Sequence, residues 1–362
     1  MGQGHGFEPR RGGTSSGLHR AGFLWLDPEE PGRRNKMNLW RTRITEMFGI
    51  KYPIIQGAFG TFGTADFAVP VSEAGGLGMI TAGGFRTPER FREELRRAKA
   101  MTDKPLAVNL TVMGCPHIEA MRDVIIEEGG VVAVETAPIR ADFLGKPLQQ
   151  HGIKWIHKVA SVKHALAAER QGADAVVIVG LEGAGFKAMD QVPTLIAIPW
   201  AVRLLKIPVI AAGGIGDARG MMAALMMGAE AVYMGTAFMA TQECPISEKH
   251  KQFLLKADPT DPKIRQKCLT PPNFEEVSKL MAERGKMPEA EWLWKLERAM
   301  VNDTGAQGMP DTSSPEALEA EVLRSVPGSL AVGVIEKIPT IREFIEGLIS
   351  EAESLRRRWA MP

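Results

Sequence analysis

Cysteine is scarce in this sequence. Its 362 residues include Cys115, Cys244 and Cys268, whose spacing forms neither a disulfide framework nor a Cys-x-x-Cys metal motif. The histidines show no metal-ligand spacing either, so we expect no metal site. A chain with so few cysteines suits a reducing compartment, and we expect it to be cytoplasmic.

Long apolar runs and an excess of charge are absent as well. No window reaches the roughly 18 apolar residues of a membrane span, and Phe23–Leu26 is too short for the core of a secretory signal. The 44 Lys and Arg residues balance 43 Asp and Glu, which leaves a formal net charge of +1. This balance supplies no field that attracts nucleic acid or an acidic membrane. We therefore expect a small-molecule substrate as partner and a monomer or homodimer.

Eight short apolar runs follow one another between residues 53 and 237. They are nearly continuous in apolar residues, as strands buried on both faces are, and helical segments with clear ends separate them. Ser161 and Gly172 delimit one such helix, and Asp217 and Gly228 another. Strict strand–helix alternation predicts a parallel sheet, and eight strands favour a closed (β/α)8 barrel, the TIM-barrel class of α/β folds. The predicted strands are residues 53–57, 77–83, 105–111, 131–137, 154–160, 174–180, 208–214 and 231–237.

The rest of the chain divides by composition. Residues 1–36 are rich in Gly and Arg without hydrophobic periodicity, and we expect a disordered N-terminal extension. The barrel is expected over 37–245, a helical lid lobe over 246–315, with a loop at 302–315, and a C-terminal segment packing back on the barrel over 316–362. In that last segment, residues 340–357 carry apolar residues at helical spacing.

Small residues end the last two predicted strands, at Ala212-Gly213-Gly214 and Gly235-Thr236. In barrels of this class the loops after strands seven and eight commonly bind phosphate, because glycines let backbone N–H groups approach the oxygens. The alternative is that these glycines only permit tight turns between strand and helix. The first interpretation predicts a cofactor with a phosphate tail at the C-terminal rim.

Four motifs resemble the nitronate monooxygenase family, formerly called 2-nitropropane dioxygenases. They are Lys51–Gly57, Ser72–Gly78, Ala211–Ile215 and Met234–Phe238. The resemblance runs from about residue 40 to about residue 245. It implies a flavoprotein oxidoreductase that binds FMN, in a family that includes NAD(P)H:quinone reductases and a bacterial enoyl-acyl-carrier-protein reductase. Further motifs favour the NAD(P)H:quinone reductase branch: residues 41–43, 156–158, 163–166 and 240–245.

The resemblance also implies positions for the cofactor-binding residues. Three of these residues would lie beside the flavin ring, followed by two polar contacts, a ring-lining alanine and five phosphate-binding residues. In that order they are Ala58, Phe59 and Gly60; Thr111 and Lys158; Ala184; and Ala212, Gly213, Gly214, Gly235 and Thr236.

Three polar residues near strand ends can also be considered from chemistry alone, and one of them, Lys158, supports this assignment. A cation such as Lys158 near the polar edge of a flavin would stabilise the reduced anion, although a salt-bridged lysine is the alternative. Because neighbouring strand residues face opposite sides, a Lys158 that faces the mouth directs His157 outward. Asn109 and Gln56 either point at a ligand or satisfy hydrogen bonds of the rim itself.

One motif departs from the family. Many members carry a histidine in the segment after the sixth strand, and Phe186 occupies that place here, within Gly180–Lys187. A phenyl ring cannot accept a proton, so we expect no nitroalkane deprotonation by this residue. Phe186 is a candidate to stack on a substrate or, alternatively, packs in the space of the histidine. Glu182 is the nearest acidic candidate for catalysis, with a structural role as rim carboxylate as the alternative.

A second departure concerns the segment near the C-terminus that approaches the cofactor in many relatives. Its expected counterpart is Gly333–Ile338, where Glu336 and Lys337 argue against close backbone approach. No site residue is therefore assigned beyond residue 245.

These observations favour an FMN-dependent enzyme that takes a hydride from NADH or NADPH and passes electrons to a quinone-like or other conjugated acceptor. Lys158, Glu182 and Phe186 are its candidate catalytic residues. The alternatives are a nitronate monooxygenase without the usual histidine, an enoyl-thioester reductase, and a non-enzymatic flavin-binding carrier or regulatory protein.

Overall fold

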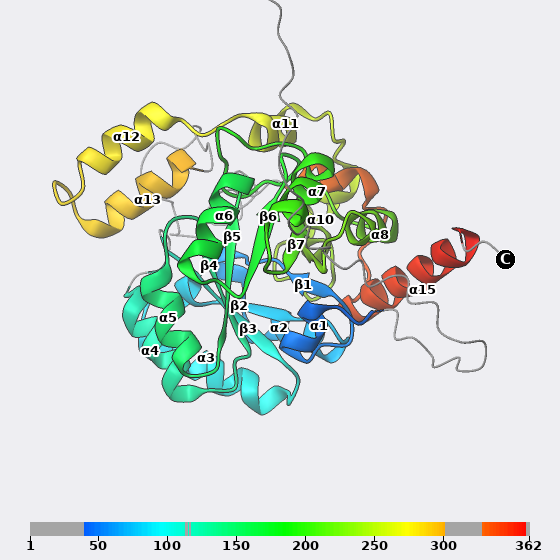
Figure 1. The fold of residues 1–362 in the computed structure, drawn as a ribbon, viewed down its shortest axis with the longest axis horizontal. Coiled ribbons are helices and arrows are strands. Elements are labelled where there is room, and N and C mark those ends of the chain that lie inside the picture. Colours follow the sequence, from blue (N-terminus) through cyan, green and yellow to red (C-terminus); the bar gives the residue numbers. More distant parts are fainter. Residues whose placement is uncertain (1–39, 113–114, 116, 301–327, 360–362) are drawn as a thin grey trace, which may run out of the picture. The chain divides into compact units, whose positions relative to one another are not determined.

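Eight parallel strands form one sheet in the computed structural model, which describes residues 40–112, 115, 117–300 and 328–359. The strands are β1 (Ile54–Gln56), β2 (Gly78–Thr81), β3 (Leu106–Thr111), β4 (Ala133–Ala137), β5 (Lys154–Val159), β6 (Ala175–Val179), β7 (Val209–Ala212) and β8 (Ala231–Met234). Their order is β1-β8-β7-β6-β5-β4-β3-β2. A bridge between Ile55 and Leu77 joins the two edge strands and closes the barrel (Figure 1). All eight predicted strands and the (β/α)8 class are confirmed.

Helices follow most strands. They are α1 (Arg43–Phe48), α2 (Ala65–Glu73), α3 (Pro88–Met101), α4 (Ile118–Glu128), α5 (Asp142–Gln150), α6 (Val162–Gln171), α7 (Thr194–Leu204), α8 (Ala218–Met226), α9 (Thr236–Met239), α10 (Glu248–Lys256), α11 (Pro262–Leu269), α12 (Phe274–Ala282), α13 (Glu289–Met300) and α15 (Ile341–Trp359). Short 3-10 turns are η1 (Gly60–Phe62), η2 (Ala82–Phe85) and η3 (Leu330–Val334). The expected tail at 1–36 and loop at 302–315 lie outside the described residues.

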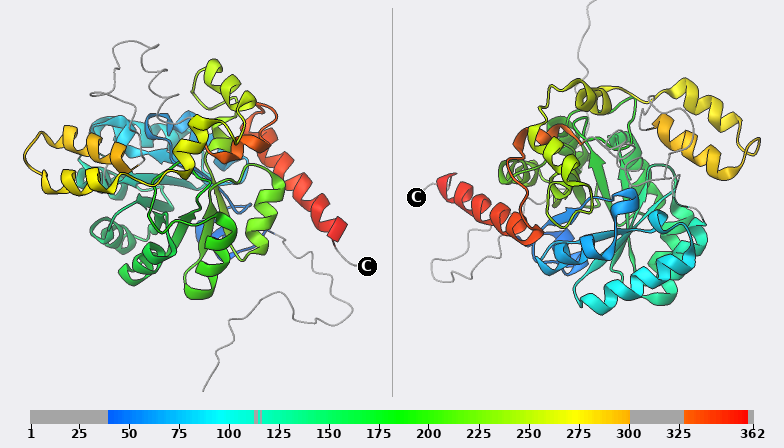
Figure 2. Two further views of the ribbon diagram at one scale, coloured as in Figure 1. Left: turned by 90° about the horizontal axis from the view of Figure 1, so that it is seen from above. Right: turned by 180° about the vertical axis from the view of Figure 1, so that it is seen from behind.

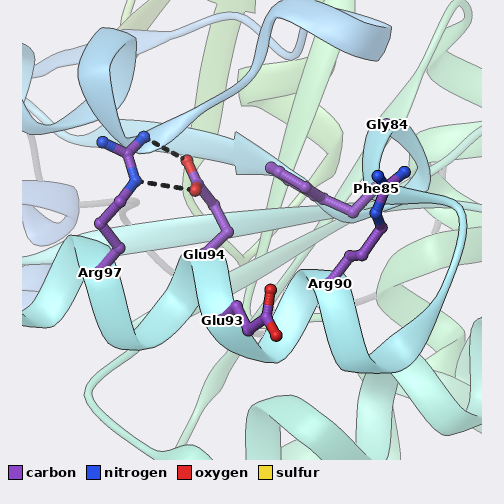
Figure 3. A pocket seen from close by; sticks show the side chains of 6 residues that line it. All are labelled: Gly84, Phe85, Arg90, Glu93, Glu94 and Arg97. Carbon is purple, nitrogen blue, oxygen red and sulfur yellow. Dashed lines mark hydrogen bonds and ion pairs between the residues drawn. The ribbon is translucent and has the colours of Figure 1, made fainter.

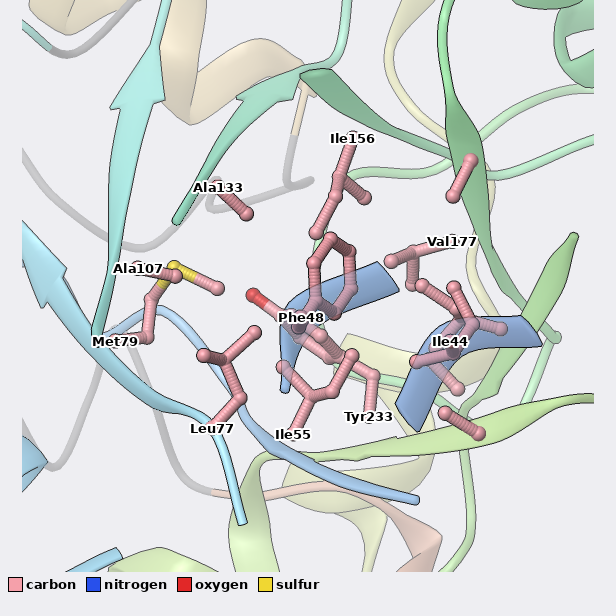
Figure 4. Packing of buried hydrophobic residues seen from close by; sticks show 14 of the residues in the cluster. Ile44, Phe48, Ile55, Leu77, Met79, Ala107, Ala133, Ile156, Val177 and Tyr233 are labelled. Atoms are coloured by element: carbon pink, nitrogen blue, oxygen red, sulfur yellow. The ribbon is translucent and has the colours of Figure 1, made fainter. Parts of the chain in front are cut away.

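Alternate residues of the strands face the interior of the barrel, which we call the lumen. The buried cluster there takes members from every strand, among them Ile55, Ile156 and Val177. Ile44 and Phe48 of α1 belong to the same cluster, and Figure 4 shows the Phe48 ring among the inward side chains. Because α1 precedes β1, it closes the N-terminal end of the lumen with apolar atoms. Polar groups are thereby left to the opposite end, which we call the mouth.

The C-terminal helix completes the ring of outer helices. The last strand, β8, is followed by only the one-turn α9, and α15 packs against both α8 and α2 instead (Figure 2). Phe344 of α15 meets Phe238 of α9 edge to face, with 5.3 Å between ring centroids. The backbone N–H of Ile341 donates to the Glu243 carboxylate at 2.9 Å. The predicted helix at 340–357 is confirmed, and it lies where an eighth barrel helix would.

The described part of the expected lid lobe, residues 246–300, contains four helices, of which α12 and α13 form a hairpin (Figure 1). Leu280, Trp292, Leu296 and Ala299 make a small apolar core between these two helices. The indole N–H of Trp292 donates to the Leu280 carbonyl at 2.7 Å, so the hairpin has its own internal order. No helix among the described residues is long and apolar enough to cross a membrane.

Replacement of Phe48 by Ala tests the plug at the N-terminal end. Phe48 is 2 % exposed, and deletion of a buried phenyl ring leaves a cavity that typically costs about 3–5 kcal/mol. We expect the free energy of unfolding, measured by urea denaturation, to fall by that order. Phe143→Ala is the matched control because Phe143 is 42 % exposed. Equal losses of unfolding free energy for the two variants would contradict the conclusion that Phe48 stabilises the fold by filling the lumen.

Candidate active site

Four polar side chains converge inside the mouth, from four different strands. They are Asn109 of β3, Glu135 of β4, Lys158 of β5 and Tyr233 of β8, and we call them the Lys158 cluster. Each occupies an inward position, two residues after a member of the buried lumen cluster: Ala107, Ala133, Ile156 and Ala231. The C-terminal end of the barrel is therefore polar where the N-terminal end is apolar.

An ion pair lies at the centre of this cluster. Lys158 Nζ is 3.2 Å from Glu135 Oε1 and 3.4 Å from Oε2. Glu135 is fully buried, whereas the Lys158 side chain keeps 15 % of its surface exposed. A buried carboxylate is tolerated only when it is paired and hydrogen-bonded. The ion pair therefore offsets the cost of burying each of the two groups. Lys158 is both salt-bridged and directed into the mouth, which joins the two interpretations that the sequence left open.

Tyr233 reaches the ion pair from the opposite wall, because β8 and β4 lie four strands apart in the eight-stranded ring. Its hydroxyl donates to Glu135 Oε2 at 2.5 Å and lies 3.1 Å from Lys158 Nζ. The Tyr233 hydroxyl oxygen also accepts a hydrogen bond from the backbone N–H of Ala58 at 2.6 Å. Burial and the neighbouring Glu135 carboxylate raise the pKa of Tyr233 well above its usual value. A neutral phenol thus ties the loop after β1 to the ion pair.

Asn109 completes the set of donors around Glu135. Its Nδ2 donates to Glu135 Oε1 at 3.1 Å, and its Oδ1 accepts from the Thr111 hydroxyl at 2.9 Å. Both ends of the Asn109 amide therefore serve the protein's own hydrogen bonds. Thr111, which is half-buried at the end of β3, lies closer to the mouth.

Gln56 lies elsewhere, on the seam between β1 and β2. Its Oε1 accepts the backbone N–H of Met79 at 2.9 Å, where the short edge strands leave a gap in the ladder. Its Oε1 thus serves the rim, whereas its buried Nε2 has no hydrogen-bond partner among the described residues.

The two glycines after β7 have positive φ angles, +97° at Gly213 and +74° at Gly214. A Cβ at Gly213 would lie 2.9 Å from backbone atoms of Gly180, and one at Gly214 would lie 2.9 Å from Glu182 Cβ. Both positions thus require glycine for turn conformation and for contact with the loop after β6. Gly235 differs, because a Cβ there would meet no atom within 4 Å. The end of β8 therefore borders open space.

Glu182 contacts the start of α7. Its Oε2 accepts the backbone N–H of Thr194 and the Thr194 hydroxyl, each at 2.9 Å. A carboxylate at a helix N-terminus satisfies an otherwise unpaired N–H group and is favoured by the helix dipole. These contacts give Glu182 a role in holding the loop after β6 against α7.

Phe186 and Lys187 connect the loop after β6 to the helical hairpin. The half-buried Phe186 ring packs on the α12–α13 core. Lys187 is buried, and its Nζ donates to the carbonyls of Leu181 at 3.1 Å and Gly183 at 2.5 Å. Burial lowers the pKa of Lys187 to about 8. The family's histidine position is therefore occupied by a packing contact, with a lysine brace beside it. Ala184, on the same loop, is half-buried.

The C-terminal segment corrects one expectation. Gly333, Glu336 and Lys337 are exposed, whereas the preceding Ser329 is buried against Thr236. The hydroxyls of Thr236 and Ser329 lie 2.8 Å apart, and the Ser329 N–H donates to Thr236 Oγ1 at 3.0 Å. Residues 328–331 thus reach the end of β8, although no site residue was expected beyond residue 245. Sequence reasoning missed Ser329 because its contact with Thr236 spans 93 residues of chain.

Sequence reasoning also missed Glu135 and Tyr233. The available signal was a single carboxylate inside the apolar run of β4, since a charge in a buried strand requires a partner. The exposed His117, just before α4 at the same end of the barrel, was not considered either. Within the described ranges, His, Cys, Asp and Glu side chains form no group that could hold a metal ion.

A hollow of about 350 Å³ on the outer face of the barrel is separate from this site. It is lined by η2 and α3, and its carboxylate Glu94 is paired with Arg97 (Figure 3). Arg97 also binds Asp66. The charges that line the hollow are thus largely neutralised. The hollow shares no residue with the Lys158 cluster.

A polar cluster at the C-terminal ends of barrel strands is where enzymes of this fold carry out their chemistry, so fold and site define a (β/α)8-barrel enzyme. The chain belongs to the nitronate monooxygenase family, which it matches over residues 41–137 and 111–351. It is accordingly an oxidoreductase, and the resemblance of the four motifs is confirmed.

Two relatives illustrate the range of this family. The chain is 29% identical over 348 residues to (3aS,4S,5R,7aS)-5-hydroxy-7a-methyl-1-oxo-octahydro-1H-indene-4-carboxyl-CoA dehydrogenase of Rhodococcus jostii, covering 87% of this chain and 97% of that protein. It is 32% identical over 263 residues to a probable nitronate monooxygenase of Staphylococcus saprophyticus, covering 61% and 74%.

Solved structures agree on the fold. FabK from Thermotoga maritima superposes with a TM-score of 0.67 at 32% identity, covering 88% of this chain and 98% of that one. Nitroalkane oxidase from Streptomyces ansochromogenes superposes with a TM-score of 0.65 at 20% identity, covering 88% and 99%. The second likeness concerns the fold alone.

The outward neighbour of Lys158 gives a testable pH dependence. His157 is buried beneath the helices, and its Nδ1 lies 2.7 Å from the Thr136 hydroxyl, which also accepts from Trp155 Nε1. Burial lowers the pKa of His157 from 6.5 to about 4. In the unfolded chain His157 is protonated below about pH 6.5, whereas in the folded chain it is protonated only below about pH 4. Lowering the pH through this range therefore favours the unfolded state.

We expect His157→Asn, whose side-chain oxygen can replace Nδ1 as acceptor, to remove that loss. Between pH 6.5 and 4 the unfolding free energy of the native protein should fall by up to roughly 3 kcal/mol more than that of the variant. Urea denaturation across this range measures the difference. His151→Asn is the control, because His151 is exposed. Parallel pH profiles for native protein and His157→Asn would refute a neutral buried imidazole.

Proposed function

We propose that this protein is an FMN-dependent NAD(P)H oxidoreductase that passes electrons to a quinone-like or other conjugated acceptor. The observation that carries the proposal is the Lys158 ammonium, held in the mouth by Glu135 and Tyr233. No described residue with acid–base chemistry occupies the position of the family's histidine, where Phe186 packs on the α12–α13 core.

The residues at the mouth fit FMN. Open space beside Gly235 at the end of β8 suits a phosphate tail, with the Thr236–Ser329 pair and Gly213-Gly214 around it. Ala58, Phe59 and Gly60 follow β1, where Tyr233 fixes the first of them. Lys158 and Thr111 line the polar side, with the buried Asn109 amide behind them, and Ala184 lies on the loop after β6. This set of backbone, hydroxyl and cationic groups suits a flat polar ring with a phosphate tail.

The protein's own residues have distinct parts in such an enzyme. FMN, when bound, accepts a hydride from the nicotinamide and passes two electrons on to the acceptor. Lys158 would offer positive charge to the polar edge of the ring. Glu182 and Lys187 would keep the loop after β6 in place, and Phe186 would join that loop to the hairpin. Hydride transfer needs orientation of the two rings more than a protein base.

Nitronate oxidation is the first alternative, and it is favoured by the similarity to probable nitronate monooxygenases. A nitronate already ionised in solution needs no protein base to react, and His117 offers an imidazole at the same end of the barrel. A second alternative is a thioester substrate. The acyl-CoA named for the Rhodococcus relative supports it, because that relative matches over nearly its whole length.

Anaerobic reduction of the bound flavin separates these functions. We expect the purified protein to bind FMN and the flavin to be bleached by NADH or NADPH, with reoxidation by a quinone. Rapid bleaching by a nitronate and none by either nucleotide would replace the proposed function with nitronate oxidation. Absence of bound FMN after reconstitution would refute the cofactor itself. Reoxidation by an enoyl-CoA but not by a quinone would favour the thioester substrate.

Replacement of Lys158 by Met tests the residue that carries the proposal. Loss of a charge-assisted hydrogen bond typically costs about 1.5–3 kcal/mol, so we expect the Kd for FMN, measured by fluorescence titration, to rise at least about tenfold. Lys154→Met is the matched control, since Lys154 starts the same strand at the other end of the barrel and pairs with Asp174. Equal FMN affinity in the two variants would remove Lys158 from the cofactor site.

A further inference from the structure

The fully buried Glu135 carboxylate has no part in the proposed chemistry beyond holding Lys158. We propose that Glu135 is a positioning residue that sets the reduction potential of the bound flavin by offsetting the charge of Lys158. This inference rests on the proposed function, because it takes FMN as the ligand of the mouth. It gives each member of the ion pair an opposite and measurable effect.

The hydrogen bonds around Glu135 suit a charged carboxylate. Asn109 Nδ2 and the Tyr233 hydroxyl donate to its two oxygens, and Lys158 Nζ contacts both. Carboxylates that accept several donors keep the charged form when buried. The mouth therefore contains a pair of opposite charges with no net charge, in place of a lone cation.

The register of the strands orients this pair. Glu135 is level with Asn109 on β3 and with Ile156 on β5. Lys158 follows Ile156 by two residues and so lies one inward position nearer the mouth. The exposed fractions agree, at 15 % for Lys158 and 0 % for Glu135. The positive end of the pair thus faces the mouth and the negative end faces the apolar lumen.

Opposite effects on the flavin follow from this orientation. Reduction adds negative charge to the flavin, so an ammonium favours the reduced form and a nearby carboxylate disfavours it. In a site of low dielectric both charges act at short range with little screening. Removal of Glu135 leaves the full ammonium charge and should raise the potential. Removal of Lys158 leaves the carboxylate and should lower it.

Tyr233 provides a variant that changes hydrogen bonds without changing charge. Tyr233→Phe removes the hydroxyl that joins Glu135 to the Ala58 N–H, while both members of the ion pair remain. We expect the Kd for FMN to rise as the loop after β1 loses its anchor. The potential should move less than in the charge variants.

The experiment measures the midpoint potential of FMN bound to full-length variants. The flavin is reduced in equilibrium with a dye of known potential, which serves as the reference. Glu135→Gln should shift the equilibrium toward reduced flavin at least tenfold, which corresponds to about 30 mV for a two-electron couple. Lys158→Met should shift it the other way. Glu351→Gln is the control, because it removes a carboxylate from the exposed pair with Arg219.

A double variant keeps the test valid if Glu135→Gln alone does not fold. Glu135→Gln combined with Lys158→Met leaves no unpaired buried charge, and at pH 8 its potential should exceed that of Lys158→Met by the same tenfold. The inference would be overturned if Glu135→Gln left the potential of the native protein unchanged or lowered it. The same holds if the double variant had a potential equal to or below that of Lys158→Met. If the native protein binds no FMN, the proposed function and this inference both fail. If FMN binds but NAD(P)H does not reduce it, only the proposed electron donor fails, because the dye still reports the potential.

Discussion

The ion pair between Glu135 and Lys158 is the interaction on which the candidate site depends. Each group offsets the charge of the other, since Glu135 is fully buried and the Lys158 side chain is only 15 % exposed. The pair joins β4 to β5, and the phenol of Tyr233 extends the connection across the barrel to β8 and the loop after β1. Segments that are 175 residues apart in sequence therefore share one polar network. Its geometry is fixed by the closed barrel, which lets opposite strands approach through the lumen.

The two ends of the barrel divide the requirements of stability and chemistry. α1 fills the N-terminal end with apolar side chains, which gives the fold a continuous buried core. The C-terminal end collects charged and polar groups that would be unfavourable in that core. This division explains why Lys154 and Lys158, on one strand and one face, have different surroundings. Lys154 lies at the N-terminal end of the barrel and pairs with Asp174, whereas Lys158, at the mouth, pairs with the buried Glu135.

Sequence patterns predicted the fold almost completely because strand and helix periods are local. The eight apolar runs, the Ser161 cap and the Asp217 cap each appear within about ten residues of chain. The site was predicted in part. Lys158 and the glycine loops were identified from their place at strand ends, but the partners of Lys158 come from β4 and β8, and no local pattern joins them. Ser329 was missed for the same reason, since its contact with Thr236 spans 93 residues. The packing of Phe186 on the hairpin depends on helices about 90 residues further along.

The place of α15 has a consequence for how this protein is assembled. A barrel whose eighth outer helix comes from residues 341–359, and whose β8 end is covered by Ser329, cannot complete its ring while those residues are still being synthesised. The strands up to β8 can pair earlier, yet the surfaces of α2 and α8 that α15 covers stay exposed until the end. The four helices from α10 to α13 are thus an insertion between the barrel's last strand and its last helix. They precede α15 in the chain, so they are synthesised before the ring of outer helices can close.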